Sequence, residues 1–83
     1  MIEFHDDAWS DYLHWQENYK KTLERINTLI KEIERHPYKG IGKPEPLKYN
    51  LAGYWSRRIN DEQRLVYKVT GATIIVIQCR YHY

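Results

Sequence analysis

The stretch YWSRRINDEQRLVYKVTGATIIVIQC, residues 54–79, decides the fold. It contains three runs that are rich in β-branched and aromatic residues, as is typical of strands. These runs cover residues 54–59, 63–69 and 73–79. The connections between them, Asn60–Glu62 and Thr70–Ala72, are short, and links of this length join neighbouring strands that run antiparallel. The stretch therefore predicts an antiparallel meander.

Two helices and a short strand are predicted upstream of this meander. Residues 1–4 are typical of a short strand, and a first helix is expected to begin near Asp6–Asp7. A second helix carries an apolar stripe and ends before Pro37; the stripe consists of Leu23, Ile26, Ile30 and Ile33. Residues 37–53 contain several Pro and Gly and predict a loop. The chain is expected to form a single α+β domain over residues 1–83, with an N-terminal strand and two helices packed on an antiparallel sheet.

The first hairpin is expected to place two arginines opposite each other. A three-residue loop at Asn60–Glu62 pairs Ile59 with Gln63, and Arg58 then lies opposite Arg64. Like charges that face each other in an antiparallel pair destabilise it, so this pair requires either a nearby carboxylate or an external anion. Two interpretations stay open. One is a solvated face with splayed guanidinium groups; the other is a phosphate clamp, since arginine binds phosphate oxygens through paired donors.

The second hairpin is expected to extend this polar face. A three-residue loop at Thr70–Ala72 pairs Val69 with Thr73, which places Gln78 opposite Arg64. The face of Gln78 then continues, two residues at a time, through Arg80 and His82. The other face is expected to form the core surface of the sheet; it collects Leu65, Tyr67, Val69, Thr73, Ile75 and Ile77.

Charge and cysteine content bear on the partners and the compartment. The net charge is +2, but residues 37–83 hold eight Lys and Arg against three acids. A basic C-terminal half favours a polyanionic partner, although ordinary solvated charge gives the same count. The one cysteine, Cys79, excludes an internal disulfide and lies in an apolar run, as expected of a buried structural thiol. No signal peptide or membrane span is recognisable, so a cytoplasmic location is expected.

Three residue types in the chain suit RNA cleavage without a metal ion. The sequence has no glycine-rich phosphate loop, no Cys/His metal spacing and no carboxylate cluster suited to two metal ions. RNA carries its own nucleophile, the 2′-hydroxyl, so a protein has to supply a base, an acid and positive charge. Glu45, His82 and Arg64 are one of each, and Tyr83 could stack on a nucleobase. An exposed loop acid and an inert chain end stay open as interpretations of Glu45 and His82.

Four motifs, in order along the chain, resemble the YoeB toxins, a branch of the RelE/ParE toxin superfamily. They are Lys43-Pro44-Glu45-Pro46-Leu47-Lys48, Gly53-Tyr54-Trp55-Ser56-Arg57-Arg58-Ile59, Arg64-Leu65-Val66-Tyr67 and Cys79-Arg80-Tyr81-His82-Tyr83. The resemblance covers essentially the whole chain. It implies a microbial-ribonuclease-like α+β fold. It also implies a metal-independent and cofactor-free endoribonuclease that depends on the ribosome, cleaves mRNA in the ribosomal A site and inhibits translation.

The resemblance also implies roles for individual residues. Glu45 matches the general base, Arg64 the transition-state arginine and His82 the general acid. The positions implied to bind substrate are Lys48, Arg58 and Tyr83. The implied products are a 2′,3′-cyclic or 3′-phosphate end and a free 5′-hydroxyl. Gln63 departs from the family, which often has histidine there; because Gln63 is expected to point away from Arg64, little effect on the chemical step is expected.

The same resemblance implies the partners. They are the ribosome with its mRNA, and a YefM-like antitoxin whose disordered segment folds over the toxin. A homodimer is expected, and promoter DNA is expected to bind only to the toxin–antitoxin complex. Two other functions stay open: a basic domain that binds RNA or the ribosome without cutting it, and a ParE-like inhibitor of DNA gyrase.

Overall fold

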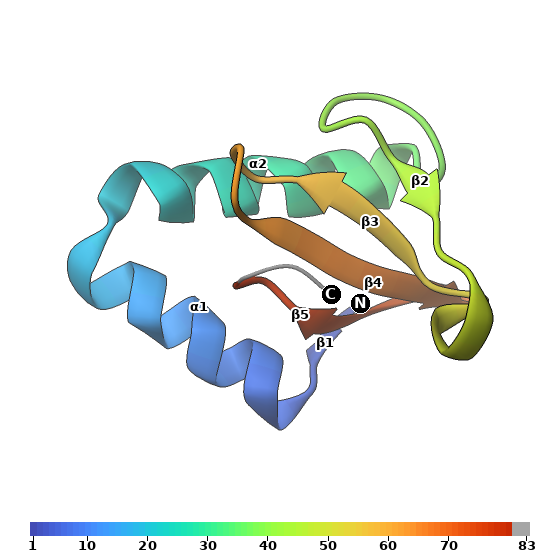
Figure 1. Cartoon of the computed structure of the whole chain (residues 1–83), viewed down its shortest axis with the longest axis horizontal. Helices are drawn as coiled ribbons and strands as arrows, with labels where there is room; N and C mark the ends of the chain where they lie inside the picture. The colour runs from blue at the N-terminus through green and yellow to red at the C-terminus, as the bar shows by residue number, and fades with distance from the viewer. Residues whose placement is uncertain (81–83) are drawn as a thin grey trace.

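The computed structural model describes residues 1–80 and shows two helices packed against a five-stranded sheet (Figure 1). The elements, in chain order, are β1 (Ile2–Phe4), α1 (Asp6–Asn18), α2 (Lys20–Arg35), β2 (Glu45–Pro46), the 3-10 turn η1 (Tyr49–Leu51), β3 (Trp55–Arg58), β4 (Arg64–Thr70) and β5 (Thr73–Gln78). This order confirms the predicted α+β class. No helix in the described part of the chain is long and apolar enough to cross a membrane.

The sheet is mixed, with strand order β1-β5-β4-β3-β2. The predicted antiparallel meander is present as β3, β4 and β5, and β2 adds an antiparallel edge within the segment that was expected to be loop. β1 forms the other edge and runs parallel to β5, with Ile2 beside Ile74. A strand as short as β1 carries no pattern that indicates its neighbour, so its parallel pairing was not predicted.

Apolar side chains of the two helices fill the space above one face of the sheet. The buried residues of α2 are Ile26, Leu29 and Ile33, and Trp15 of α1 joins them. On the sheet they meet Leu65, Tyr67, Ile74 and Val76. Burying a large apolar side chain contributes about 1.5–3 kcal/mol. This cluster therefore holds both helices on the sheet and leaves the opposite face to other roles.

The predicted register of the first hairpin is confirmed. Arg58 lies opposite Arg64, and the Ile59 N–H donates to the Gln63 carbonyl at 3.0 Å. The Asn60 side chain closes the turn, because its Oδ1 accepts from the main-chain N–H groups of Glu62 and Gln63, each at 2.9 Å. Asparagine commonly stabilises turns in this way.

The predicted register of the second hairpin is wrong by one residue. Thr70, not Val69, pairs with Thr73, because the turn has two residues and begins with Gly71 at φ +58°. Two-residue hairpin turns require a positive φ at that position, which glycine adopts without steric cost. The core face of β5 therefore presents Ile74 and Val76, and not the predicted Thr73, Ile75 and Ile77.

A bulge in β5 lies next to Gln78. Val66 pairs with Gln78 where an unbroken register gives Ile77, so one residue of β5 is skipped. The predicted pairing of Gln78 with Arg64 is therefore wrong. Gln78 nevertheless lies on the face of Arg64, because the one-residue slip of the hairpin and the extra residue of the bulge cancel.

The loop between α2 and β2 closes around the fully buried side chain of Arg57. The guanidinium group donates to three main-chain carbonyls, those of His36, Lys39 and Ile41. Its Nε donates to the Tyr67 hydroxyl at 3.2 Å, and that hydroxyl donates to the Pro37 carbonyl at 2.6 Å. One side chain therefore fixes the loop that leads to β2.

Candidate functional site

One row of side chains crosses four strands on the sheet face that points away from the helices. The register pairs Glu45 with Ser56, Ser56 with Val66, and Val66 with Gln78. These positions alternate with those that face the helical core. Ser56 and Val66 are buried, whereas Glu45 is exposed. The row therefore has buried side chains in its middle and a polar side chain, Glu45 or Gln78, at each end.

A second row on the same face lies two residues further along the strands and carries positive charge. It consists of Arg58, at the end of β3, and Arg64, at the start of β4. Neighbouring strands lie about 4.8 Å apart, and two residues span about 7 Å along a strand. The Cα atom of Glu45 is therefore about 8 Å from that of Arg58 and about 12 Å from that of Arg64.

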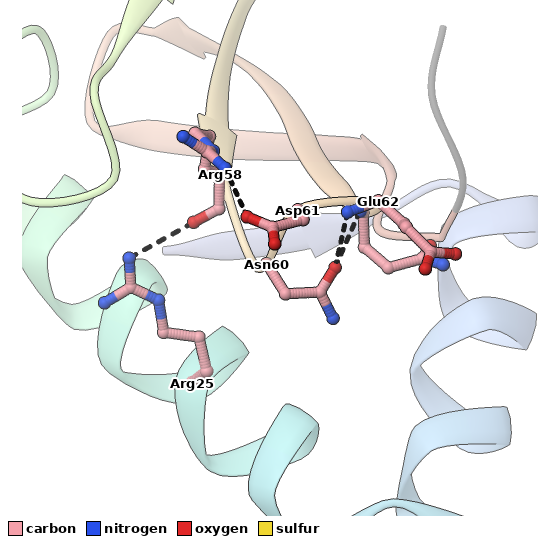
Figure 2. Close-up of polar contacts among 6 residues, drawn as sticks. Arg25, Arg58, Asn60, Asp61 and Glu62 are labelled. Carbon is pink, nitrogen blue, oxygen red and sulfur yellow. Dashed lines mark hydrogen bonds and ion pairs between the residues drawn. The ribbon is translucent and has the colours of Figure 1, made fainter.

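A carboxylate of the adjoining turn relieves the repulsion between the two arginines. Arg58 Nη2 lies 2.7 Å from Asp61 Oδ1. Figure 2 marks this contact with a dashed line. The Asp61 side chain is 97% exposed and that of Arg58 is 35% exposed, so water screens this ion pair and makes it weak. Within residues 1–80, the Arg64 side chain has no hydrogen bond or ion pair. An anion can thus replace the Asp61 carboxylate on Arg58, and it can bind to Arg64 without displacing a partner within residues 1–80.

The main chain at Arg58 is held from two sides. Its N–H donates to the Gly42 carbonyl at 2.7 Å, and its carbonyl accepts from Arg25 Nη2 of α2 at 3.2 Å (Figure 2). Gly42 has φ +83°, and a Cβ atom at that position would lie 2.9 Å from the Leu29 side chain. Glycine therefore permits the close approach that fixes Arg58 against the preceding loop.

Glu45 and Lys48 come from the short segment that pairs with β3. Pro44 and Pro46 flank Glu45, which lies in extended backbone on β2, the conformation that a following proline favours. Lys48 is exposed and directly precedes η1. The predicted acid His82 and the predicted substrate residue Tyr83 lie outside the described residues. In the part of the chain that is described, no group of three or more His, Cys, Asp or Glu side chains could hold a metal ion.

Two side chains of α1 hold the chain at Cys79, just after β5. Trp15 Nε1 donates to the Cys79 carbonyl at 2.7 Å, and the Cys79 N–H donates to Asp11 Oδ2 at 3.1 Å. The strand ends at Gln78 and Arg80 lies in a bend, so the predicted continuation of the strand through Arg80 is wrong. The side chains of α1 replace strand pairing there, and no local sequence pattern signals contacts between residues more than sixty positions apart.

Cys79 is a buried structural thiol, as predicted. Its side chain is fully buried, and Sγ donates to the Ala8 carbonyl at 3.5 Å. Burial, with a smaller contribution from the Asp11 charge, raises the pKa of the Cys79 thiol to about 12. The thiol therefore stays protonated at neutral pH, and a protonated thiol is a poor nucleophile.

We expect Asp11→Asn to change stability in a pH-dependent way. Burial raises the pKa of the Asp11 carboxyl above 3.8, since it outweighs the Cys79 hydrogen bond and the Arg80 charge, which lower it. A raised folded-state pKa gives stability that is present below the unfolded pKa and is lost as pH rises through the folded one. Asparagine keeps an acceptor for the Cys79 N–H but carries no charge.

The free energy of unfolding of Asp11→Asn, relative to the native chain, should therefore rise between acidic and neutral pH. Urea unfolding of both proteins below pH 3.8 and at neutral pH checks this. A difference between the two proteins that is the same at both pH values contradicts it.

The chain is similar over nearly its whole length to known bacterial toxins. The model of a family described as YoeB-like toxin of bacterial type II toxin-antitoxin system matches residues 4–83. Toxin YoeB of Synechocystis sp. is 60% identical over 99% of this chain and 95% of the relative. Toxin YoeB of Streptomyces coelicolor is 56% identical over 99% of this chain and 98% of the relative.

Solved structures of similar sequence also have the same fold. The YoeB/ParE toxin from Agrobacterium tumefaciens matches with a TM-score of 0.96 at 49% identity, over 99% of this chain and 98% of that one. A YoeB-YefM complex from Staphylococcus aureus matches with a TM-score of 0.95 at 51% identity, over 100% of this chain and 97% of that one. A YoeB dimer from the same organism matches with a TM-score of 0.93 at 52% identity, over 99% of this chain and 95% of that one. YafQ from E. coli, at 0.82 and 19% identity, shares the fold alone.

Proposed function

Because this chain belongs to the YoeB-like toxins of bacterial type II toxin–antitoxin systems, we propose that it is a ribosome-dependent endoribonuclease that cleaves mRNA in the ribosomal A site and so inhibits translation. One observation carries the proposal: the exposed Glu45 carboxylate shares a face of the sheet with the paired Arg58 and Arg64. A candidate base and the charge to hold a phosphate thus lie within reach of one RNA linkage.

In the proposed reaction the Glu45 carboxylate takes the proton of a ribose 2′-hydroxyl, whose oxygen forms a bond to the adjacent phosphorus. The bond from phosphorus to the 5′-oxygen of the next nucleotide breaks, and His82 donates a proton to that oxygen. Arg64 binds the phosphate oxygens, on which negative charge increases in the transition state. The products are a 2′,3′-cyclic phosphate, which water can open to a 3′-phosphate, and a free 5′-hydroxyl.

The remaining proposed roles concern substrate binding. A phosphate can take the place of Asp61 on Arg58, because the Arg58–Asp61 pair is exposed and weak and arginine binds phosphate through paired donors. Lys48 adds a cation three residues after the candidate base. Tyr83 is proposed to orient a nucleobase by stacking.

We also propose a YefM-like antitoxin as the neutralising partner and a homodimer as the free form. The S. aureus relatives, about half identical to this chain, form a complex with YefM in one structure and a dimer in another. Residues 37–83, with eight Lys and Arg against three acids, suit an acidic segment of an antitoxin. Light scattering of the purified chain measures its mass, and a monomer at micromolar concentration contradicts the dimer.

The proposed function is tested by incubating the purified chain with an mRNA under three conditions. The mRNA is free, bound to ribosomes with an open A site, or bound to such ribosomes with an excess of a YefM-type antitoxin. New 5′-hydroxyl ends, detected by labelling with a polynucleotide kinase, should form on the ribosomes and should disappear with antitoxin.

Two results overturn the proposal. Ribosome binding without new RNA ends indicates a binding module that does not cut. Inhibition of DNA gyrase supercoiling, with mRNA left intact, indicates a ParE-like function.

A further inference from the structure

A hollow of about 580 Å³ opens beside Glu45 and is lined by residues 45–51. Its volume lies within the range of small-ligand sites, about 300–1,000 Å³. Its apolar walls come from Pro46, Leu47 and Leu51. Lys48 and Asn50 add one cation and one amide. The hollow is thus mostly apolar and has a few polar groups, next to the candidate base.

Tyr49 lines this hollow in a conformation that costs stability. Its φ is +59°, in the left-handed region that bulky side chains rarely adopt. The residue is 90% exposed, so burial of its ring within the chain does not compensate for the strain. Strained residues of this kind are found preferentially at functional sites.

The main chain around Tyr49 is hydrogen-bonded, so the ring is presented from a defined turn. The Ala52 N–H donates to the Tyr49 carbonyl at 3.0 Å, and the Leu51 N–H donates to the Lys48 carbonyl at 3.1 Å. These two bonds form η1. The turn holds Tyr49 next to Lys48 and four residues from Glu45.

The Tyr49 ring has no aromatic neighbour among residues 1–80. Tyr38 is also exposed, at 52%, but its ring lies 4.8 Å from that of Trp55. The Tyr49 ring is therefore open to a flat group from another molecule.

We propose that this hollow binds one nucleobase of the RNA substrate, stacked on the Tyr49 ring, with the Asn50 amide bonded to the edge of the base. The inference rests on the proposed function, because the hollow shares Glu45 with the cleavage face and so receives a nucleotide next to the scissile linkage. Every nucleobase has an aromatic face that can stack on tyrosine. Apolar walls with a single cation suit a base better than a second phosphate, whose desolvation there is costly.

The test measures RNA binding without cleavage. The probe is a dye-labelled RNA trinucleotide with 2′-methoxy groups, which lacks the nucleophile, and its Kd for the full chain is measured by fluorescence anisotropy. Loss of stacking on one base weakens binding about 5–150-fold, so Tyr49→Ala should raise the Kd by that factor. Tyr49→Phe keeps the ring and should stay within about twofold of the native chain.

Tyr49→Gly separates the loss of binding from unfolding. Glycine adopts φ +59° without strain, so the Tm of this variant should equal or exceed that of the native chain. Its Kd for the trinucleotide should rise as in Tyr49→Ala. Loss of binding in a protein that is at least as stable supports the ring as a contact.

Three outcomes overturn the inference: no binding of the trinucleotide to the native chain at millimolar concentration, an equal Kd for Tyr49→Ala, or weaker antitoxin binding by Tyr49→Ala with unchanged RNA binding. If the native chain nevertheless cleaves mRNA on ribosomes, the proposed function stands and only the inference fails. Conversely, Tyr49-dependent RNA binding supports the inference even in a chain that does not cleave.

Discussion

Replacing Glu45 with glutamine is expected to lower the rate of mRNA cleavage on ribosomes by about 10²–10⁴-fold, which is the usual contribution of a general base. Glutamine has the shape of glutamate but cannot take the proton of the 2′-hydroxyl. Glu45 is exposed on an edge strand, so the variant should fold normally. Single-turnover cleavage, with the toxin in excess over ribosomes that carry a defined codon in the A site, measures the chemical step.

Glu62→Gln is the matched control for Glu45→Gln. It removes the same charge from the exposed turn between β3 and β4, away from the candidate base, and should stay within about twofold of the native rate. Cleavage by Glu45→Gln at the native rate would show that Glu45 is not the base. An equal loss in both variants would show that net charge, and not proton transfer, decides the rate.

Replacing Arg57 with leucine is expected to lower the free energy of unfolding by about 3–5 kcal/mol. The change removes the donor of four acceptors, namely the partly buried carbonyls of His36, Lys39 and Ile41 and the buried Tyr67 hydroxyl. Each unsatisfied buried polar group costs about 1–3 kcal/mol, and relaxation of the loop toward water recovers part of this. A domain of this size has a total stability of about 5–15 kcal/mol, so the loss should be large.

Urea unfolding measures the effect, and Arg58→Leu is the control in the adjacent position. Within residues 1–80 the Arg58 side chain makes only the exposed ion pair with Asp61, so its replacement should cost less than about 1 kcal/mol. Similar losses in the two variants would contradict the structural role of Arg57. Hydrogen exchange should also show faster opening of residues 36–41 in Arg57→Leu than in the native chain.

The two hairpins show where sequence reasoning succeeds and where it fails. At the first turn the Asn60 side chain stabilises the predicted three-residue connection. A connection of that length places Arg58 opposite Arg64, as the structure shows. The second turn depends on Gly71, which permits a tighter two-residue connection. The bulge beside Gln78 has no sequence signal, because residues 74–77 of β5 are all apolar and their pattern does not show which face each side chain takes.

The candidate site was also predictable only where a local sequence pattern exists. Alternation along β3 gives Arg57 and Arg58 opposite faces, so the sequence pattern does indicate that Arg57 faces the core. The contacts of Asp11 and Trp15 with Cys79 had no such signal, since they join α1 to the far end of the chain. Local patterns place residues on faces, whereas contacts across the fold require the structure.

Mapping the 5′ ends of an mRNA after the chain acts on ribosomes with one defined codon in the A site tests the central claim most directly. The native chain should produce 5′-hydroxyl ends within that codon. Arg64→Ala, which removes the arginine that has no partner in residues 1–80, should lower their yield at least about 10²-fold. An absence of cuts with a folded, antitoxin-free native chain, or equal cutting by Arg64→Ala, would contradict the account.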